Sequence, residues 1–275
     1  MLDRRFDVQA LFDVRGRTGG SGHFGRAMAL ALAQAGVQVA ILGRHAEATQ
    51  TVAETIQAEG GSAIGIACDV LSRAALEQSQ EQVSNAFGPV DILINAAGGN
   101  SPTATTSTEQ TFFDLDAEAV NRVFGLNFTG TFQSCQVFGR GMADRGQGCI
   151  VNVTSMSGLR PLTRVPAYGA AKAAVGNFTH WLATYMAQDY SPRIRVNALA
   201  PGFFLTEQNR YLMVDAQSGV ITPRGKTIID HTPMGRLGAP EDLLGTLFWL
   251  VSPASAFVTG VVIPVDGGFS SFSGV

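Results

Sequence analysis

The sequence predicts an α/β protein in which a parallel β-sheet carries helices on both faces. Three observations predict this class. Apolar runs alternate with longer segments of helical period, a glycine-rich turn opens an early helix, and 275 residues with 45% hydrophobic content can bury one large core. We expect one domain over residues 1–275, because no linker or internal repeat divides the chain.

Apolar runs mark the expected strands, and helical spacing of apolar residues marks the helices between them. The strands are expected at residues 37–42, 63–67, 90–94, 149–153, 194–199 and 261–265. The helices are expected at residues 24–35, 46–59, 72–87, 117–143, 167–188 and 240–251. The carboxyl ends of the strands should then share one edge of the sheet, where such folds bind their ligands.

Two connections are longer than is usual between a strand and a helix, and both follow strands at that edge. Residues 98–114 are rich in Gly, Thr and Ser, and residues 201–236 mix Pro, Gly and polar residues. We expect them to form the walls of a substrate cleft, with residues 201–236 as its lid.

Composition and charge argue against several other classes of protein. The net charge of −3 and the scattered Lys and Arg residues do not favour nucleic-acid binding. No apolar run approaches the roughly 20 residues of a membrane span, and residues 1–14 are too charged for a signal peptide, so we expect a cytoplasmic protein. Three distant cysteines and four scattered histidines predict neither a disulfide nor a metal site.

The glycine-rich turn Thr18-Gly-Gly-Ser-Gly-His-Phe-Gly25 opens the first expected helix. Glycines let the backbone approach a pyrophosphate, and the N–H groups of a helix N-terminus attract phosphate. The signal is weak by itself, because many such turns are only turns. The candidate cofactor-binding residues in this segment are Gly19, Ser21, Gly22, His23, Phe24 and Gly25.

The residue after the next strand bears on the choice of dinucleotide. A carboxylate there would accept hydrogen bonds from the adenosine ribose, whereas this chain has Arg44. A guanidinium suits the additional phosphate of NADP(H), so the sequence favours NADP(H) over NAD(H). The alternative is that Arg44 is an ordinary solvated arginine.

Three side chains are candidates for acid–base chemistry. Tyr168 and Lys172 are four residues apart on an expected helix and therefore share one face. A free phenol titrates near pH ~10, and a neighbouring ammonium lowers that pKa. Ser155 follows the strand at 149–153, at the carboxyl edge, where its hydroxyl could hold a substrate oxygen beside Tyr168.

These motifs together resemble those of the short-chain dehydrogenase/reductase family over nearly the whole chain. Residues 18–25 resemble its T-G-x-x-x-G-x-G turn, residues 95–98 its N-N-A-G segment, and residues 264–268 its last strand. The resemblance implies a Rossmann-type, doubly wound sheet of about seven strands in the order 3-2-1-4-5-6-7. It implies a catalytic tetrad of Asn127, Ser155, Tyr168 and Lys172, and a homotetramer or homodimer. It adds as cofactor contacts Asp69, Val70, Asn95, Ala96, Gly98, Tyr168, Lys172, Pro201, Gly202, Phe204 and Thr206.

Residues 97–100, 112–116, 160–162, 201–210 and 231–235 further resemble the D-mannonate oxidoreductase branch, also called fructuronate reductase. That branch implies a sugar-acid substrate, whose carboxylate and hydroxyls suit cationic and polar side chains. For most of these candidates the alternative is an ordinary polar loop. The candidate substrate-binding residues are Gly99, Asn100, Ser155, Arg160, Gln208, Asn209 and Arg210.

The resemblance implies that a reduced nicotinamide passes hydride to a ketone carbon while Tyr168 gives its proton to the oxygen. Lys172 would lower the phenol pKa and bind the nicotinamide ribose, and Asn127 would anchor a water beside Lys172. One alternative is a reductase of another polar ketone, such as a keto-gluconate or a 3-oxoacyl thioester. Another is a non-catalytic dinucleotide-binding scaffold.

The chain departs from the family pattern at three places. The family has an apolar strand directly before the glycine-rich turn, whereas this chain has Arg15-Gly-Arg17. Either residues 10–14 take the place of that strand, or the fold is disturbed at the cofactor end, or the chain lacks the residues. His23 replaces the middle glycine and can crowd a pyrophosphate. Ala96 replaces the second Asn, which should cost little because Asn95 remains.

Overall fold

The computed structural model describes residues 9–13, 22–205, 210, 213–215 and 219–274, with the backbone alone described for 9–13, 22 and 23. Its sheet is parallel throughout and has the order β3-β2-β1-β4-β5-β6-β7, which confirms the predicted class and strand order. The strands are β1 (Gln9–Asp13), β2 (Gln38–Gly43), β3 (Ala63–Ala67), β4 (Ile92–Asn95), β5 (Gly148–Val153), β6 (Ile194–Pro201) and β7 (Val262–Val265).

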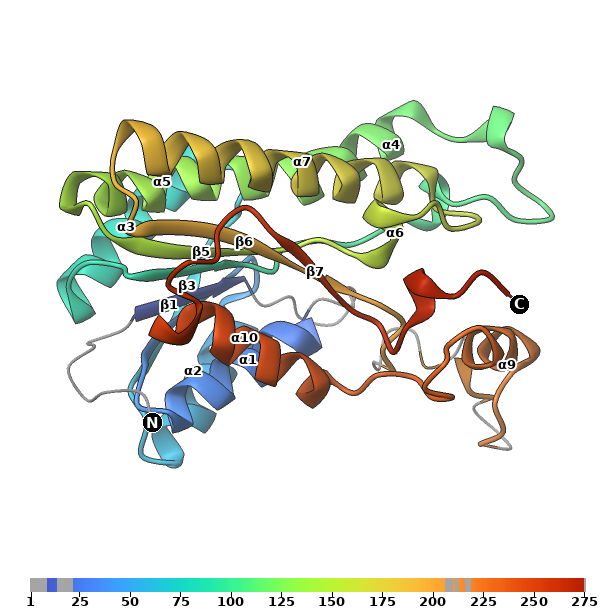
Figure 1. Ribbon diagram of the computed structural model, residues 1–275, viewed down its shortest axis with the longest axis horizontal. Coiled ribbons are helices and arrows are strands. Elements are labelled where there is room, and N and C mark those ends of the chain that lie inside the picture. Colours follow the sequence, from blue (N-terminus) through green and yellow to red (C-terminus); the bar gives the residue numbers. More distant parts are fainter. Residues whose placement is uncertain (1–8, 14–21, 206–209, 211–212, 216–218, 275) are drawn as a thin grey trace.

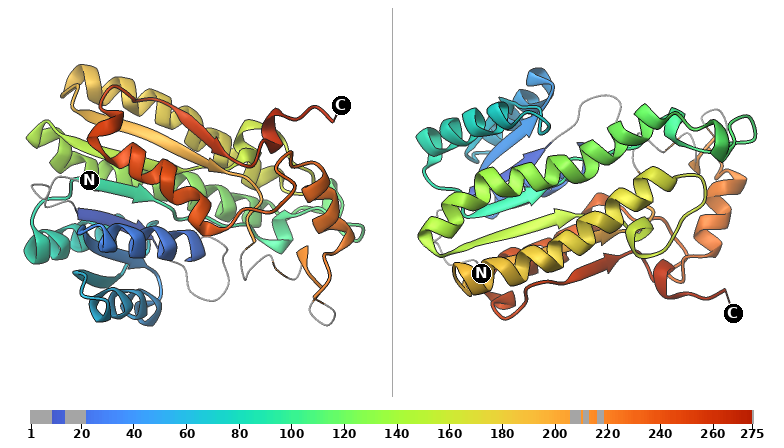
Figure 2. Two further views of the ribbon diagram at one scale, coloured as in Figure 1. Left: turned by 60° about the horizontal axis from the view of Figure 1, so that its bottom comes forward. Right: turned by 90° about the horizontal axis from the view of Figure 1, so that it is seen from above.

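Helices cover both faces of this sheet (Figures 1 and 2). Helices α1, α2 and α10 lie on one face, and α3, α5 and α7 lie on the other with α4 beyond them. The helices are α1 (Gly22–Gln34), α2 (Ala46–Ala58), α3 (Arg73–Phe87), α4 (Ala117–Phe124), α5 (Gly130–Arg145), α6 (Met156–Leu159), α7 (Pro166–Asp189), α9 (Pro223–Asp230) and α10 (Leu244–Val251).

Alternate residues of the inner strands supply two separate cores. In β2, Val39 and Ile41 pack with α1, α2 and α10, whereas Ala40 and Leu42 pack with α3, α5 and α7. A strand buried on both faces is apolar at most positions, because successive side chains point to opposite faces. This explains why the inner strands are largely apolar in the sequence, with a few buried polar residues such as Asn152 and Asn197.

The central strand, β1, is formed by residues 9–13, which residues 14–17 separate from the glycine-rich turn. β1 lies between β2 and β4, with Leu11 opposite both Ala40 and Leu93. Residues 9–13 therefore take the place of the strand that the family has directly before the turn, which is the first of the three alternatives, shifted by one residue. The strand completes the hydrogen bonding between β2 and β4, so the sheet is continuous at the cofactor end.

The helix expected over residues 117–143 is interrupted. A π-helical turn, Gly125–Thr129, joins α4 to α5, which ends at Arg145. Nδ2 of Asn127 donates to the carbonyl oxygen of Val123 at 2.8 Å, which satisfies an acceptor within the widened turn. A π turn inserts one residue into the helix and re-aims the side chains that follow, and such turns are frequent at functional sites.

Helix α9 was not expected, because residues 201–236 have the composition of a loop. Its start nevertheless carries strong local signals: Thr222 caps the helix, its Oγ1 accepting from the N–H of Gly225 at 3.1 Å, and Pro223 occupies the first turn. The last expected helix, at residues 240–251, begins with a 3₁₀ turn at Pro240–Leu243. Among the described residues no helix is long and apolar enough to cross a bilayer, and no cluster of three potential metal ligands occurs.

Candidate active site

Three of the predicted catalytic side chains meet at the carboxyl end of β5. Tyr168 and Lys172 lie on one face of α7, with Nζ of Lys172 5.8 Å from the centre of the Tyr168 ring. Ser155 is the N-cap of α6, where its Oγ accepts from the N–H of Ser157 at 3.2 Å. Its hydroxyl also hydrogen-bonds the phenol of Tyr168. The arrangement places a hydroxyl, a phenol and an ammonium side by side.

Burial dominates the electrostatics of the phenol. It raises the pKa of Tyr168 above its usual value, and the hydrogen bond with Ser155 opposes that rise without reversing it. The expected lowering of this pKa by Lys172 stays a prediction. The desolvation of the phenol could not be predicted from the spacing of two residues.

Lys172 is held by contacts that the sequence did not indicate. Its side chain is 3% exposed, and Nζ donates to the carbonyl oxygen of Val153 at 2.8 Å. Oγ1 of Thr154 donates to the carbonyl oxygen of Lys172 at 2.6 Å. A Cβ on Gly158 would lie 2.7 Å from the backbone of Lys172, so this glycine lets α6 approach α7 closely. Thr154 and Gly158 thus fix the backbone that carries the ammonium.

Asn127 ties the loop after β4 to the same place. Its Oδ1 accepts from the N–H of Gly99 at 3.1 Å, and its Nδ2 donates to the carbonyl oxygen of Gly99 at 2.7 Å. A Cβ on Gly98 would lie 2.6 Å from Oδ1 of Asn127 and 2.9 Å from Nζ of Lys172. Asn127 and Lys172 therefore meet at Gly98, Tyr168 adjoins Lys172, and Ser155 adjoins Tyr168.

Asn95 makes contacts that the sequence did not indicate. Its Nδ2 donates to Oδ1 of Asn152 at 2.9 Å and to Sγ of Cys135 at 3.2 Å, and Asn152 in turn donates to Thr179 at 2.9 Å. This buried chain links β4, β5, α5 and α7. The contacts of the Asn95 side chain position the end of β4, and its predicted contact with a cofactor stays a prediction. The adjacent Ala96 is 3% exposed and packs in the core.

The remaining cofactor candidates lie along the carboxyl edge. The backbones of Gly22 and His23 form the first turn of α1, and Gly25 is buried one turn further on. Phe24 packs edge-to-face against Phe204, with their ring centres 5.1 Å apart, which joins the start of α1 to the segment after β6. Gly202 donates its N–H to the carbonyl oxygen of Val265 at 3.0 Å and directly follows the buried Pro201. Gly19, Ser21 and Thr206 lie outside the described residues.

A small hollow lies near the ends of β2 and β4. Its lining includes Val70, a predicted cofactor contact, and Thr131 of α5. Asp69 is exposed, with Oδ1 accepting from the N–H of Leu71 at 3.0 Å, and Arg44 is exposed at the end of β2. The full lining is Leu42, Val70, Ile94, Asn95, Ala97, Thr131 and Ser134.

The candidate substrate residues are more widely spread. Asn100 and Arg160 are exposed, as is Arg210, whereas Gln208 and Asn209 lie outside the described residues. Nδ2 of Asn100 donates to Oγ1 of Thr105 at 2.8 Å, so its amide is partly used within the loop. Among the described residues, no hydrogen bond or ion pair joins Asn100, Arg160 and Arg210 to one another.

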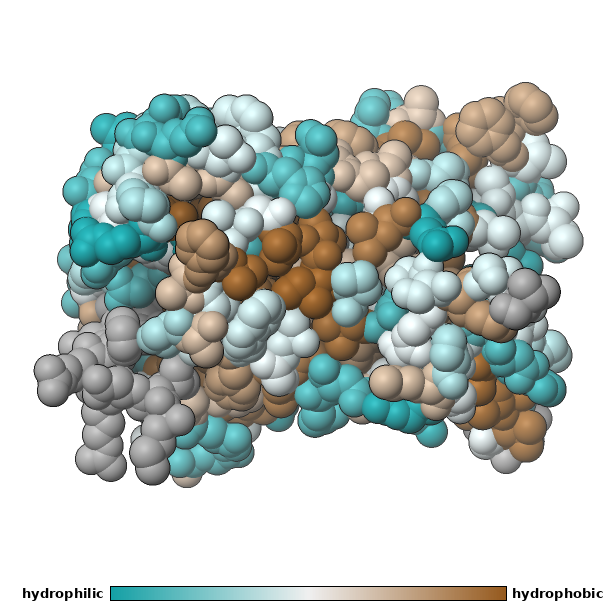
Figure 3. All heavy atoms as spheres, viewed as in Figure 1, coloured by the Kyte–Doolittle hydropathy of each residue, from teal (hydrophilic) through white to brown (hydrophobic). Residues whose placement is uncertain are grey.

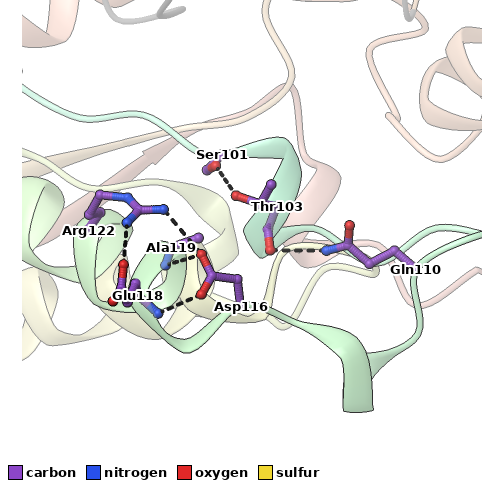
Figure 4. A network of polar contacts seen from close by, with 7 residues as sticks. All are labelled: Ser101, Thr103, Gln110, Asp116, Glu118, Ala119 and Arg122. Carbon is purple, nitrogen blue, oxygen red and sulfur yellow. Dashed lines mark hydrogen bonds and ion pairs between the residues drawn. The ribbon is translucent and has the colours of Figure 1, made fainter.

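The connection from β4 to α4 is held by polar contacts of its own (Figure 4). Gln110 donates to the carbonyl oxygen of Thr103 at 3.0 Å, and Thr103 hydrogen-bonds Ser101. Asp116 caps α4 and pairs with Arg122 at 3.2 Å. The connection expected to form one wall of a substrate cleft is therefore held by hydrogen bonds of its own.

A separate cavity of about 400 Å³ lies at the ends of β6 and β7. Ser155, Tyr168 and Lys172 are not among the described residues that line it. Its lining is Phe203, Phe204, Met234, Arg236, Gly238, Asp242, Thr246, Pro264, Val265, Asp266, Gly267 and Gly268.

The residues present suit an extended dinucleotide. The first turn of α1 offers backbone N–H groups at the edge of the sheet, and the missing side chain of Gly98 lets Lys172 and Asn127 approach the loop after β4 closely. Fold and site together define a nicotinamide-dependent oxidoreductase acting on CH–OH groups.

Comparisons with known proteins identify the family to which this enzyme belongs. The family model described as enoyl-(acyl carrier protein) reductase matches residues 21–270. The chain is 50% identical over 267 residues to an uncharacterized oxidoreductase, UxuB, of Bacillus subtilis, covering 94% of this chain and 95% of that protein. This chain belongs to the short-chain dehydrogenase/reductase family.

Two solved structures extend the likeness. A Haemophilus influenzae protein, provisionally assigned as a D-mannonate oxidoreductase and solved with bound NAD, has 41% identity and a TM-score of 0.90, with 98% of each chain covered. A gluconate 5-dehydrogenase from Burkholderia cenocepacia, in complex with NADP and tartrate, has 31% identity and a TM-score of 0.82, with 96% of this chain and 95% of that chain covered.

Proposed function

We propose that this enzyme interconverts a secondary alcohol and a ketone of a sugar acid of the D-mannonate and D-fructuronate type. The observation that carries the proposal is a series of neighbouring side chains, in which Ser155 adjoins Tyr168, Tyr168 adjoins Lys172, and Lys172 meets Asn127 at Gly98. The likeness to the Haemophilus protein, over 98% of each chain, supports the sugar-acid class.

In the proposed reaction, Tyr168 donates its proton to the ketone oxygen, or accepts one from the alcohol in the reverse direction. Ser155 holds that oxygen beside the phenol. The nicotinamide cofactor, when bound, supplies or accepts the hydride. Lys172 would contact the nicotinamide ribose, and Asn127, fixed by three hydrogen bonds, would hold a water beside Lys172.

NADP(H) is the proposed cofactor, with NAD(H) as the alternative. Arg44 is exposed at the end of β2, where a guanidinium can pair with a phosphate on the adenosine ribose. Of the two related structures, one carries NAD and the other NADP, so they do not decide which cofactor this enzyme uses. Fluorescence titration of NADPH and NADH against wild type and Arg44→Ala tests this. The substitution should weaken NADPH binding and leave NADH binding unchanged.

The segment 201–236 is proposed as the lid of the substrate cleft, contributing Arg210 and the neighbouring Gln208 and Asn209. The exposed Asn100 and Arg160 would contribute from the opposite wall. A sugar acid offers these residues several hydroxyls and one carboxylate, which form neutral and charge-assisted hydrogen bonds.

A homotetramer or homodimer is the proposed assembly. Apolar side chains gather in the middle of the face shown in Figure 3, and β7 is an edge strand whose Val262, Ile263 and Val265 are only partly buried. Edge strands and exposed apolar patches favour association. Light scattering coupled to size exclusion measures the mass, and a monomer would reject this proposal.

The substrate is tested by steady-state rates with NADPH and NADH on D-fructuronate, 5-ketogluconate and an acetoacetyl thioester. Preference for D-fructuronate supports the proposal. Preference for 5-ketogluconate would favour the gluconate dehydrogenase alternative, to which the 31% identical Burkholderia enzyme points. Cofactor binding without turnover of any of the three would favour a non-catalytic role.

A further inference from the structure

Two arginines that the resemblance did not indicate lie on segments at one end of the sheet. Arg164 lies in the connection between α6 and α7, four residues before Tyr168, and Arg224 lies in the first turn of α9. Figures 1 and 2 show α6 and α9 at the same end of the molecule, the end at which β5 and β6 finish. This is also the end of β5 that Ser155 follows.

Arg164 is held in an unfavourable backbone conformation. Its φ of 75° makes it the one non-glycine residue with positive φ in the part of the chain that the structure describes. Such a conformation is costly for a long side chain and persists only where surrounding contacts impose it. Here the carbonyl oxygen of Arg164 accepts from the N–H of Thr106 at 2.9 Å, which ties the residue to the loop after β4. The backbone from which the exposed Arg164 side chain extends is therefore fixed against that loop.

Arg224 is partly buried, and no ion pair with a described residue neutralises its charge. Its Nε is buried and has no hydrogen-bond partner among the described residues. Desolvation, and next to it the positive charge of Arg164, lower the pKa of this guanidinium. The exposed Glu109 interacts electrostatically with Arg164, but no carboxylate of the described residues lies within ion-pair distance of either arginine. Two like charges from distant segments thus approach each other, and a buried donor remains unpaired.

We propose that Arg164 and Arg224 together bind the carboxylate of the substrate. This inference rests on the proposed function and assigns the charged end of the sugar acid to a named pair of residues. A carboxylate would neutralise the repulsion between the guanidiniums and accept the forked hydrogen bonds that arginine offers. With the carboxylate held there, the chain of hydroxyl-bearing carbons extends toward Ser155 and Tyr168. Arg160 and Arg210 are then left to contact hydroxyls or solvent.

The test compares Arg164→Asn, Arg224→Gln and a matched control, Lys226→Gln. Asn tolerates positive φ, so Arg164→Asn removes the charge without forcing the backbone to change. Lys226 lies on the same helix as Arg224 but is 72% exposed and pairs with Asp230 at 2.8 Å, so its loss changes net charge equally. Circular dichroism and thermal unfolding check that each variant folds.

Two measurements are made on each folded variant. The first is KM and kcat for D-fructuronate and for D-fructose, its neutral analogue without the carboxylate. The second is the affinity for tartrate, a dicarboxylate probe, measured by calorimetry on the enzyme saturated with NADPH. We expect each arginine variant to raise KM for D-fructuronate about tenfold or more and to weaken tartrate binding similarly. D-fructose kinetics, and all parameters of Lys226→Gln, should change less than about twofold.

The outcomes separate this inference from the proposed function. If no sugar acid is turned over, the proposed function fails, and the tartrate titration still decides on the arginine pair. If tartrate does not bind to the wild type, or binds equally to Arg164→Asn and Arg224→Gln, the inference is overturned whatever the substrate. A similar loss with D-fructose would overturn it as well, because the arginines would then act on folding or on the whole cleft.

Discussion

A Cβ atom placed on Gly98 would lie 2.6 Å from Oδ1 of Asn127, far inside van der Waals contact. Asn127 cannot readily move away, because its amide makes two hydrogen bonds with Gly99 and a third with Val123. The same Cβ would lie 2.9 Å from Nζ of Lys172. The loop after β4 and the catalytic lysine therefore share a space that only glycine leaves open.

Gly98→Ala should lower kcat/KM about tenfold or more, because the added methyl displaces Asn127 or Lys172 from its position. Overpacking of this kind also costs roughly 1–3 kcal/mol of unfolding free energy. Steady-state kinetics and thermal unfolding measure both effects. The control is Gly245→Ala in α10, where a Cβ meets nothing within 4 Å, so stability should be unchanged or higher and activity unchanged. Equal activity of Gly98→Ala and wild type would contradict the close approach.

Ser155→Ala should shift the pH dependence of alcohol oxidation to higher pH. Oxidation needs the phenolate of Tyr168, so its rate rises with pH through the pKa of that group. Burial already raises this pKa, and removal of the opposing hydrogen bond from Ser155 raises it further. The measurement is kcat against pH for both proteins, with a solvent isotope effect to confirm that proton transfer contributes to the rate. A shift to lower pH would reverse the assigned role of Ser155.

Asn95→Leu should destabilise the fold by about 1–3 kcal/mol, because Oδ1 of Asn152 then loses a buried donor. Since the Asn95 side chain is occupied inside the protein, NADPH affinity in the folded variant should change only a few-fold. Denaturant unfolding gives the first quantity and fluorescence titration the second. Loss of cofactor binding at unchanged stability would restore the direct cofactor contact that the motif suggested.

The three cysteines should react slowly with thiol reagents in the native protein. All three are buried, and burial raises the pKa of Cys135 to about 12 and that of Cys149 to about 11. The reactive thiolate is therefore scarce at neutral pH. Colorimetric titration should detect no rapid thiol in the native state and three in denaturant. Rapid modification of Cys135 without unfolding would be inconsistent with this burial.

The sequence predicted the sheet well because its inner strands are buried on both faces and hence mostly apolar. It was ambiguous only for β1, since residues 9–13 contain only three apolar residues and are separated from the glycine-rich turn. The candidate catalytic residues were identified from the local spacing of Tyr168 and Lys172 and from Ser155 at a strand end, together with the family motifs. These signals lie within short stretches of the chain and can be recognised without a structure.

Other features depend on contacts between distant segments and could not be predicted. The π turn at Asn127 is stabilised by bonds to Gly99, and the raised pKa of Tyr168 reflects burial. The proximity of Arg164 and Arg224 arises only when α9 folds against the cleft, and the sequence gives no spacing rule for it.

The central claim is that the phenol of Tyr168 transfers the proton. Single-turnover reduction of D-fructuronate by NADPH, with Tyr168→Phe beside wild type, measures this step directly. The phenyl ring keeps the packing and removes only the hydroxyl, so the rate should fall by about 10²-fold or more while the NADPH dissociation constant changes less than about twofold. A variant that reduces the ketone as fast as wild type would contradict the account.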